Sequence, residues 1–304
     1  MSTPTDPQEL LAQLPALAGT PMTLVELSGG LTNRNFKVTT PDGVFVARCS
    51  GTKSGLLGIN RDHEHYNSCA AAEAGVGAEV IDYRPDLGVL LVRFLPGITL
   101  TNADFADPAI LHRVAQSCRQ LHRGPRFGNQ FDMFELQQKY RMVLHDNNFP
   151  IPPGYDDHAP TFNRIRQILQ STDSTTVPCN NDLLAANFID DGTRIWLIDY
   201  EYSGNNDPCF ELGNIWGECG LSVEQLDDLV CAYYGRPLRH KIARARLQGI
   251  VGKYGWALWG SIQHSASPLA FDYWDWAMQR HESAVEEFRG PDLPRLLADV
   301  QTCD

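Results

Sequence analysis

Two stretches of this 304-residue chain decide its fold: residues 181–187, with the sequence NDLLAAN, and residues 196–201, with the sequence WLIDYE. Asp182 is followed five residues later by Asn187, and Asp199 ends an apolar run in the second stretch. The Asp-Asp-Gly turn between the two stretches predicts a short hairpin, which would bring the three polar side chains together. Each of them alone has a plainer explanation, as a helix cap, a turn residue or a strand end.

Two carboxylates and an amide in this order meet the requirements of phosphoryl transfer. One carboxylate has to lie near the hydroxyl that accepts the phosphoryl group, and Mg²⁺ needs hard oxygen ligands such as those of Asn187 and Asp199. Two further features of such sites, a glycine-rich turn and a cation on a strand, occur upstream in the matching order. The pattern therefore favours phosphoryl transfer over three unrelated polar residues.

The glycine-rich turn is formed by residues 28–36, with the sequence SGGLTNRNF, between two expected strands. Gly29 and Gly30 have no Cβ, so backbone N–H groups beside them can approach phosphate oxygens. Asn33 could close the turn or contact a phosphate. A tight hairpin without any ligand is the alternative for this segment.

The strand cation is Arg48, at the end of a strand expected at 44–48, and Glu64 follows on a helix expected at 60–74. A cation on a small sheet is costly to bury unless it is paired, and Glu64 is a suitable partner. Kinases hold the nucleotide phosphates with a strand cation that is paired with a helical Glu. A salt bridge with a purely structural role is the alternative.

The chain divides into a β-rich part and a helical part. Residues 1–95 contain the expected strands, one helix and a hairpin over 79–94, whereas residues 96–304 show mostly helical spacing. We therefore expect an α+β fold with two lobes: a small antiparallel-sheet lobe that binds nucleotide, and a larger helical lobe for catalysis and substrate binding. The helices expected in the second lobe lie near 108–121 and over 131–145, 161–171, 223–234, 238–265 and 271–289.

Composition and charge exclude several classes of function. The chain is 43% hydrophobic and 20% charged, and 37 acidic against 25 basic residues give a net charge of -12. Such a chain repels nucleic acid and anionic membranes on average, while a cationic small molecule is tolerated. No apolar run is long enough for a membrane-spanning helix, and no secretion signal is apparent. The eight cysteines form no CxxC pair, which is typical of reduced thiols in a cytoplasmic protein.

Tryptophans are concentrated late in the chain. Four of the six lie within residues 256–276, and Trp256 and Trp259 share a helix face. A quaternary ammonium group cannot donate hydrogen bonds, so a site for it uses aromatic ring faces and sometimes a carboxylate. An aromatic core between helices is the alternative that composition alone favours.

Together these segments resemble the bacterial choline/ethanolamine kinase family, in the aminoglycoside-phosphotransferase-like branch of the protein-kinase-like fold. The resemblance extends over residues 24–289, nearly the whole chain. The motifs that carry it are residues 29–36, Asn60 and Arg61 with Glu64, residues 74–77 (AGVG), 94–97 (FLPG), 181–187, 198–202 (IDYEY) and the tryptophan region with Gln263.

The resemblance implies roles for individual residues. Asp182 would be the catalytic base, and Asn187 and Asp199 would be the Mg²⁺ ligands. The residues implied in the ATP site are Gly29, Gly30, Asn33, Arg48, Glu64 and Arg93, with adenine against residues 91–95 at the hinge between the two lobes. The residues implied in a cage around the cationic substrate are Glu201, Tyr202, Trp256, Trp259 and Trp276.

Two residues depart from the usual pattern of the family. Asn180 stands where a His usually precedes the catalytic Asp, and we expect a weakened or rewired loop from this change. An Asn side chain can still donate and accept hydrogen bonds. Arg48 stands where many relatives have Lys, and its planar fork could position phosphate differently.

The predicted function is ATP- and Mg²⁺-dependent phosphorylation of the hydroxyl of choline or a close amino alcohol, by a cytoplasmic monomer or homodimer. Ethanolamine, thiamine and aminoglycosides are the alternative acceptors, and GTP is an alternative donor. The rival from another class is a pseudokinase-like protein that binds choline or nucleotide without turnover. Asn180 favours this rival, whereas the presence of Asp182, Asn187 and Asp199 together argues against it.

Overall fold

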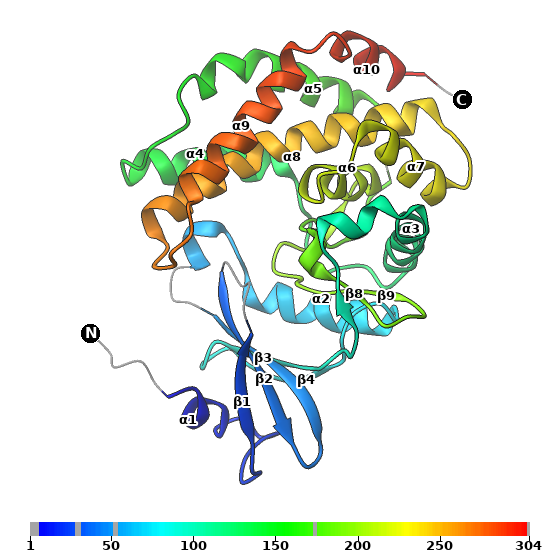
Figure 1. The fold of residues 1–304 in the computed structure, drawn as a ribbon. Coiled ribbons are helices and arrows are strands. Elements are labelled where there is room, and N and C mark those ends of the chain that lie inside the picture. The colour runs from blue at the N-terminus through cyan, green and yellow to red at the C-terminus, as the bar shows by residue number, and fades with distance from the viewer. Residues whose placement is uncertain (1–5, 28–31, 51–53, 173–174, 303–304) are drawn as a thin grey trace.

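The computed structural model describes residues 6–27, 32–50, 54–172 and 175–302, and it shows a small sheet lobe below a larger helical lobe (Figure 1). The five-stranded sheet is antiparallel and has the strand order β1-β2-β3-β5-β4. The expected two-lobed α+β fold is thus confirmed. The elements of the small lobe are α1 (Pro7–Leu11), β1 (Thr23–Leu27), β2 (Asn33–Thr40), β3 (Gly43–Ser50), α2 (Arg61–Glu73), β4 (Val80–Arg84) and β5 (Val89–Arg93).

The sheet has one face in a small core and one face toward the helical lobe. Side chains alternate between the two faces along each strand. The N-terminal segment covers the core face, where the buried residues are Leu11, Leu14, Leu17, Phe36, Val38, Phe45, Ala47, Val89 and Leu91. The opposite face carries Asn35, Val46 and Arg48. Asn35 lies directly across from Arg48 in the register of β2 and β3, so the two side chains are neighbours on this face.

The chain passes into the second lobe immediately after β5, through residues 94–97, which we call the crossing segment. The backbone N–H of Phe94 donates to the carbonyl oxygen of Val44, which ties the crossing segment to β3 at 3.0 Å. At Gly97 the segment meets β8 (Phe188–Asp190), and a Cβ there would lie 2.6 Å from the carbonyl oxygen of Asp190. A glycine is therefore required at this contact between the crossing segment and the hairpin of the helical lobe.

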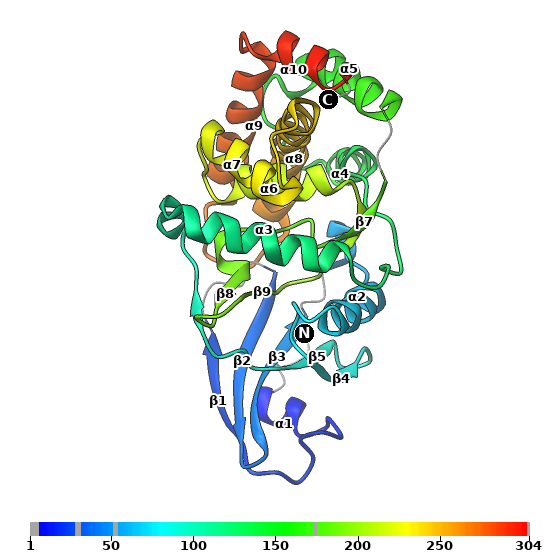
Figure 2. The ribbon, with the colours of Figure 1, turned by 90° about the vertical axis from the view of Figure 1, so that its right-hand side faces the viewer.

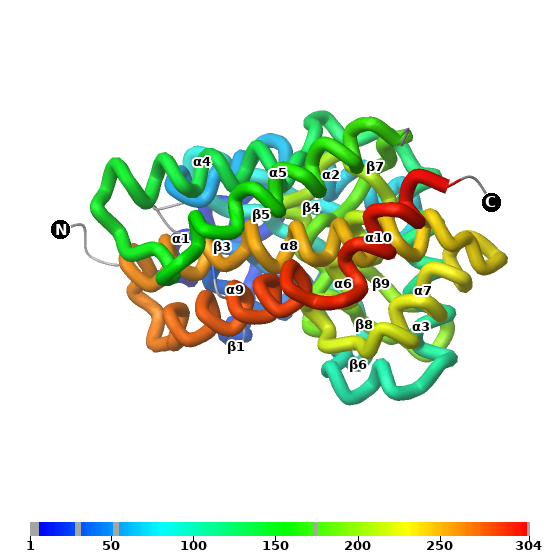
Figure 3. Tube along the Cα trace, turned by 90° about the horizontal axis from the view of Figure 1, so that it is seen from above, coloured from blue at the N-terminus to red at the C-terminus, as the bar shows by residue number. Residues whose placement is uncertain are grey.

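Helix α8 lies in the middle of the helical lobe, and α4, α6 and α9 pack around it (Figure 3). It is 28 residues long and is buried on nearly all sides between Ala243 and Gln263. Most residues of this stretch are apolar or small, as such burial requires, and the buried Arg244 and Arg246 form ion pairs with Asp207 and Glu287. The helices of this lobe are α3 (Pro108–His122), α4 (Met133–Asp146), α5 (Ala159–Ser171), α6 (Pro208–Glu218), α7 (Val223–Tyr234), α8 (Arg239–Ala266), α9 (Tyr273–Arg289) and α10 (Leu293–Asp299).

Two glycines allow α6 and α8 to approach each other closely. A Cβ on Gly213 would lie 2.6 Å from the backbone nitrogen of Gly249, and a Cβ on Gly249 would lie 2.6 Å from the carbonyl oxygen of Gly213. Neither position has room for a side chain. The backbone contact therefore fixes the separation of the two helices.

Short strands connect the helical lobe to the sheet lobe. The predicted hairpin is present as β8 and β9 (Ile195–Leu197), and it lies between α3 and the sheet (Figure 2). β6 (Ile98–Thr99) extends this hairpin, and β7 (Val177–Cys179) pairs with β10 (Gly204–Asn206). The sequence analysis did not predict α6, α10 or the β7–β10 pair. Within the described ranges, every helix is too short or too polar to cross a membrane.

Candidate active site

Two adjoining cavities lie where the lobes meet. The larger, of about 500 Å³, lies between the sheet and the β8–β9 hairpin, and we call it the interlobe cleft. The smaller, of about 130 Å³, is lined by residues of the loop before β8 and of α6, α8 and α9, and we call it the aromatic cavity. Four residues line both cavities and so form a shared wall: Asn35, Ala186, Asn187 and Asp199.

Asp182 lies in the loop between β7 and β8 and lines the aromatic cavity. Burial raises the pKa of its carboxyl well above the usual range, and the nearby carboxylates of Asp199, Glu218 and Glu201 raise it further. A carboxylate with a raised pKa is a better proton acceptor than one in water. The environment of Asp182 therefore suits a general base.

Asn180 holds this loop through both ends of its side-chain amide. The amide nitrogen donates to the carbonyl oxygens of Ile198 at 3.1 Å and Asp199 at 2.9 Å. The amide oxygen accepts the backbone N–H of Asp182 at 3.0 Å. The expected weakening of the loop is therefore not observed, because an amide can donate and accept at once.

Glu211 on α6 anchors the same loop from the other side. Its two carboxylate oxygens accept the backbone N–H groups of Asn180 at 2.9 Å and Asn181 at 2.6 Å. Asn181 has a φ of +68°, a backbone conformation that a non-glycine residue rarely adopts. The buried carboxylate therefore helps to hold a strained turn directly before Asp182.

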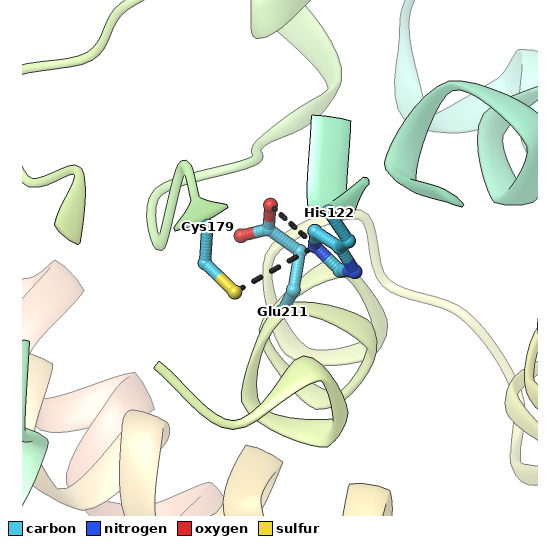
Figure 4. A group of neighbouring side chains, drawn as sticks. All are labelled: His122, Cys179 and Glu211. Carbon is cyan, nitrogen blue, oxygen red and sulfur yellow. Dashed lines mark hydrogen bonds and ion pairs between the residues drawn. The ribbon is translucent and has the colours of Figure 1, made fainter. Parts of the chain in front are cut away.

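Two further buried side chains surround Glu211 (Figure 4). His122 lies with Nε2 3.5 Å from a carboxylate oxygen of Glu211 and 3.6 Å from Sγ of Cys179, while its Nδ1 is 2.8 Å from the hydroxyl of Tyr233. Histidine, thiol and carboxylate can also bind metals, and these ligand atoms lie within 4.8 Å of one another. Both oxygens of Glu211 are already hydrogen-bonded to the loop, which fits a structural role for the group.

Asn187 and Asp199 are brought together at the base of the β8–β9 hairpin. The backbone N–H of Ile198 donates to the carbonyl oxygen of Asn187 at 3.0 Å. The side-chain nitrogen of Asn187 donates to the carbonyl oxygen of Asp182 at 2.8 Å, so the amide oxygen is the end that can face a cation. Asp199 has a φ of +66°, a second strained backbone position at this wall.

Arg48 contacts three carboxylates at the shared wall. Its guanidinium lies 3.2 Å from Glu64, 2.7 Å from Asp199 and 3.3 Å from Glu201. The expected pair with Glu64 is present, and it is part of a larger buried network. Arg48 therefore links β3 and α2 to the segment that follows β9.

Arg61 at the start of α2 completes this network. It lies 2.6 Å from Glu64 and 3.2 Å from Glu201, and it donates to the side-chain oxygen of Asn33 at 2.9 Å. Asn33 in turn donates to Glu201 at 2.9 Å. Two arginines thus face three carboxylates, and burial beside Asp199 raises the pKa of Glu201 to about 7. The sequence analysis gave Arg61 no role, because its partner lies 140 positions further along the chain.

Of four other predicted residues, two are placed less centrally and two lie outside the described residues. Glu201 lines the aromatic cavity, but one of its oxygens is shared by Arg48, Arg61 and Asn33. Arg93 is exposed at the rim of the interlobe cleft and forms an ion pair with Glu79 at 2.5 Å. Gly29 and Gly30 lie outside the described residues, so their predicted contacts with phosphate stay predictions.

The predicted aromatic residues come together in the aromatic cavity. Tyr202, Trp256, Trp259 and Trp276 all line it, from α8, α9 and the segment after β9. The Tyr202 and Trp256 ring centroids are 5.0 Å apart, and those of Trp259 and Trp276 are 5.3 Å apart, both pairs edge to face. Trp256 and Trp259 are also almost fully buried, so they are at once core residues and cavity walls.

Glu218 was missed by the sequence analysis. It ends α6, lines the aromatic cavity and has a side chain that is 9% exposed. Arg280 on α9 contacts one of its oxygens at 2.7 Å and stacks over the ring of Trp276 at 4.8 Å from the centroid. The cavity therefore contains the carboxylate that a cation site can use beside ring faces. In the sequence, Glu218 could have been found only by recognising residues 208–218 as a buried helix that ends at this residue.

The donor atoms at the shared wall fit a divalent cation. The amide oxygen of Asn187 and the carboxylate of Asp199 are hard oxygen ligands from two points of one hairpin, and Asp182 is close by. Mg²⁺ prefers such ligands and usually combines one or two carboxylates with phosphate oxygens. The fold and this site define a phosphotransferase of the protein-kinase-like class.

Comparison with known proteins identifies the family within this class. Residues 24–233 match the family model described as choline/ethanolamine kinase. A solved choline/ethanolamine kinase family protein from Mesorhizobium loti is 32% identical, with a TM-score of 0.85 over 97% of each chain. The chain belongs to the choline/ethanolamine kinase family. It is an ATP-binding transferase that phosphorylates the hydroxyl of choline or a close amino alcohol.

More distant proteins share part of the sequence or the fold alone. The protein LicA of Haemophilus influenzae is 27% identical over 84% of this chain and 98% of its own length. The solved choline kinase LicA from Streptococcus pneumoniae shares the fold, with 23% identity and a TM-score of 0.77 over 92% of this chain and 97% of that chain. An aminoglycoside 2'-phosphotransferase also shares the fold, with a TM-score of 0.62 and 14% identity.

Proposed function

We propose that the enzyme is a choline kinase that uses ATP together with Mg²⁺. One observation carries the proposal: Asn187 and Asp199 lie on the wall that the interlobe cleft shares with the aromatic cavity. A phosphoryl group held at this wall is within reach of a nucleotide on one side and of a small alcohol on the other. Proximity of this kind is the main requirement of phosphoryl transfer.

The size of the aromatic cavity supports a small acceptor. Its volume is about 130 Å³. A dry protein cavity of about 150 Å³ holds benzene, so a space of this order suits a molecule of about that size; ethanolamine is smaller than benzene and choline is somewhat larger. Thiamine and aminoglycosides are much larger than either, so this volume favours choline and ethanolamine among the candidate acceptors.

The chemistry of the cavity wall supports a quaternary ammonium group. The indole N–H of Trp259 donates to the hydroxyl oxygen of Tyr202, and that of Trp256 donates to the side-chain oxygen of Asn214, so the rings offer their surfaces to a ligand. Ring faces attract a cation that cannot donate hydrogen bonds, and they serve the strongly hydrated primary ammonium of ethanolamine poorly. Glu218 adds negative charge at the same place. We therefore infer a preference for choline over ethanolamine.

The residues that line the interlobe cleft support the binding of the nucleotide there. Val92, Phe94 and Leu95 line it on the side of the crossing segment, and they suit the apolar faces of adenine. Arg48 lies at the other end of the sheet face, beside the shared wall, and suits the phosphates. We propose residues 1–95 as the nucleotide-binding lobe and 96–304 as the catalytic and substrate-binding lobe on this basis.

Asn187 and Asp199 are the residues that would hold Mg²⁺. When bound, the ion neutralises charge on the phosphates and on the group in transfer. The chain itself supplies the positions of these two oxygens through the β8–β9 hairpin and the strained backbone of Asp199. Arg48 and Glu64 would anchor the phosphates from the sheet lobe.

Asp182 would orient and deprotonate the choline hydroxyl. The hydroxyl oxygen forms a bond to the γ-phosphorus, the bond from that phosphorus to the bridging oxygen of ADP breaks, and its electron pair leaves with ADP. The hydroxyl proton passes to the carboxylate of Asp182. The raised pKa of Asp182 suits this step, because a stronger base takes the proton more readily.

The rival interpretation as a pseudokinase-like binding protein loses its one supporting feature. It rested on Asn180, whose amide makes the hydrogen bonds that secure the loop before Asp182. The site of the reaction is proposed to be the cytoplasm, where ATP is available. The free thiols of the seven cysteines in the described part of the chain agree with a reducing compartment.

A coupled assay of ADP formation tests the proposal with choline, ethanolamine, thiamine and kanamycin as acceptors. We expect the highest kcat/KM with choline, formation of phosphocholine, and loss of activity in excess EDTA that added Mg²⁺ restores. A higher kcat/KM for ethanolamine, or turnover of kanamycin, would reject choline as the acceptor. Full activity without any divalent cation would reject the metal site.

A further inference from the structure

Arg48 and Asp199 form an ion pair between the two lobes, and Asp199 is also one of the two proposed Mg²⁺ ligands. Nη1 of Arg48 lies 2.7 Å from Oδ1 of Asp199. Arg48 lies on β3 in the sheet lobe, and Asp199 lies in the segment that follows β9 in the helical lobe. The ion pair therefore places a positive charge of the chain directly at the carboxylate that is proposed to hold a divalent cation.

The three carboxylates around Arg48 differ in their other partners. Glu64 and Glu201 also form ion pairs with Arg61. Among the described residues, Asp199 forms an ion pair with Arg48 alone. Loss of the Arg48 cation would therefore deprive Asp199 of its ion-pair partner, whereas the other two carboxylates would keep Arg61.

Asp199 is also more accessible than the other two carboxylates. Its side chain is 27% exposed and lines both cavities, whereas the side chains of Glu64 and Glu201 are 3% exposed. The oxygen of Asp199 that faces Arg48, Oδ1, is buried. Arg48 thus covers one of the two carboxylate oxygens and offsets their negative charge, and this charge is what attracts Mg²⁺ to the site.

We propose that Arg48 competes with Mg²⁺ for Asp199 and so keeps the affinity of the nucleotide-free enzyme for the ion low. This inference rests on the proposed function, because it takes Asp199 as a metal ligand. Arg48 lines the interlobe cleft, where the phosphates of ATP are proposed to bind. A guanidinium binds phosphate oxygens through its planar fork of N–H donors. The phosphates therefore draw Arg48 away from Asp199, and the metal and the nucleotide bind cooperatively.

The size of the effect follows from the charges. A unit charge and a divalent cation about 5 Å apart repel each other enough in water to weaken binding roughly 10- to 20-fold, and burial strengthens the repulsion. We therefore expect Arg48→Met to lower the Kd for Mn²⁺ about tenfold or more without nucleotide. Mn²⁺ is the probe because the EPR signal of the free ion reports binding directly. Arg48→Lys keeps the charge and should stay within about threefold of wild type.

Arg61→Met is the matched control, because it removes one cation from the same network and Arg61 forms no ion pair with Asp199 among the described residues. It should lower the Kd for Mn²⁺ by no more than about threefold, since a more distant charge is better screened. The double variant Arg48→Met with Glu64→Gln keeps the net charge of the network. It should still bind Mn²⁺ more tightly than the wild type, because Asp199 has lost its partner. A melting curve shows that each variant is folded.

A second measurement tests the release of Arg48 by the nucleotide. Saturating ADP should lower the Kd for Mn²⁺ by a larger factor in the wild type than in Arg48→Met, where no release is needed. Equal factors would overturn the release, and a folded Arg48→Met that binds Mn²⁺ no more tightly than Arg61→Met would overturn the competition. Asp199→Asn separates the two proposals. An unchanged Kd for Mn²⁺ in Asp199→Asn would reject the metal site and the competition with it, whereas weaker binding there without a gain in Arg48→Met would reject the role of Arg48 alone.

Discussion

Trp259 donates its indole N–H to the hydroxyl oxygen of Tyr202 at 2.8 Å, which joins α8 to the segment that carries Asp199. The polar atoms of both aromatic side chains are thereby satisfied within the protein. Their rings are left to interact through their faces and edges, as a site for a quaternary ammonium group requires. The same bond couples the wall of the aromatic cavity to the strand end that places the proposed metal ligand.

Replacement of the proposed base is expected to abolish most of the turnover. Asp182→Asn should lower kcat by about 10²–10⁴-fold, because a positioned base contributes this much to proton transfer. The Kd of ADP should stay within about twofold, since Asp182 lines the aromatic cavity and not the interlobe cleft. Asp42→Asn, at an exposed turn, is the control. Near-normal kcat in Asp182→Asn would remove this residue from catalysis.

A smaller ring in the aromatic cavity is expected to weaken the binding of choline selectively. Trp256→Phe should raise KM for choline by roughly 2–30-fold, from the loss of part of a cation–π contact worth about 0.5–2 kcal/mol. KM for ATP should hardly change. Since Trp256 is also a core residue, the melting temperature has to be measured beside KM. Trp274→Phe on α9, outside the cavity lining, is the control, and an unchanged choline KM in Trp256→Phe would contradict the cage.

Removal of the carboxylate charge of Glu218 from the aromatic cavity is expected to weaken the binding of any cationic acceptor. Glu218→Gln should raise KM for choline by roughly 5- to 50-fold, because attraction between charges about 4 Å apart is worth on the order of 1 kcal/mol in water and more in a partly buried site. Part of the loss arises because Arg280 is left without its partner. The double variant Glu218→Gln with Arg280→Gln should then regain stability but not choline affinity. Equal KM values in wild type and Glu218→Gln would exclude the carboxylate from substrate binding.

Lys253 on α8 is expected to make stability depend on pH. Burial lowers the pKa of its ammonium to about 8, although Glu287 and Glu218 face it. In the unfolded chain the same group titrates near 10.4, so between these pH values the unfolded state binds more protons and the stability of the folded state rises with pH. The charged groups around Lys253 are Glu218 on α6, Arg246 on α8, and Arg280 and Glu287 on α9.

Lys253→Met measures this contribution. At pH 7 the variant should unfold at a higher temperature than wild type, since a buried charge is removed, although the contact of Lys253 with the Trp216 ring at 3.7 Å is lost as well. The difference should shrink as the pH is raised from 8 to 10, where the lysine of the folded protein is neutral. A difference in melting temperature that is constant over this range would show that Lys253 titrates normally.

The sequence predicted those parts of the site that local pattern encodes. The hairpin between Asn187 and Asp199 is marked by its turn and its apolar strands, and both side chains lie where it places them. Arg48 and Glu64 could be paired because strand and helix follow each other directly. These features depend on neighbours in the chain, which periodicity and turn residues reveal.

The parts that were missed depend on contacts between distant residues. Glu218 lies on α6, whose residues from Cys209 to Trp216 are all buried, so no alternation of polar and apolar faces marks this helix. Arg61 meets Glu201 and Asn33 only after the two lobes have come together. We expected Asn180 to weaken or rewire the loop, because a sequence motif does not show that the side-chain amide hydrogen-bonds to three backbone groups.

The contact between Gly213 and Gly249 has a consequence for how acceptor size can change during evolution or by design. Glu218 lies further along α6 and Trp256 further along α8, so the spacing at the two glycines sets the distance between opposite walls of the aromatic cavity. An added methyl group at either glycine would push the helices apart without touching the substrate. The size of acceptor that the cavity admits can therefore change through substitutions at residues that do not contact the substrate.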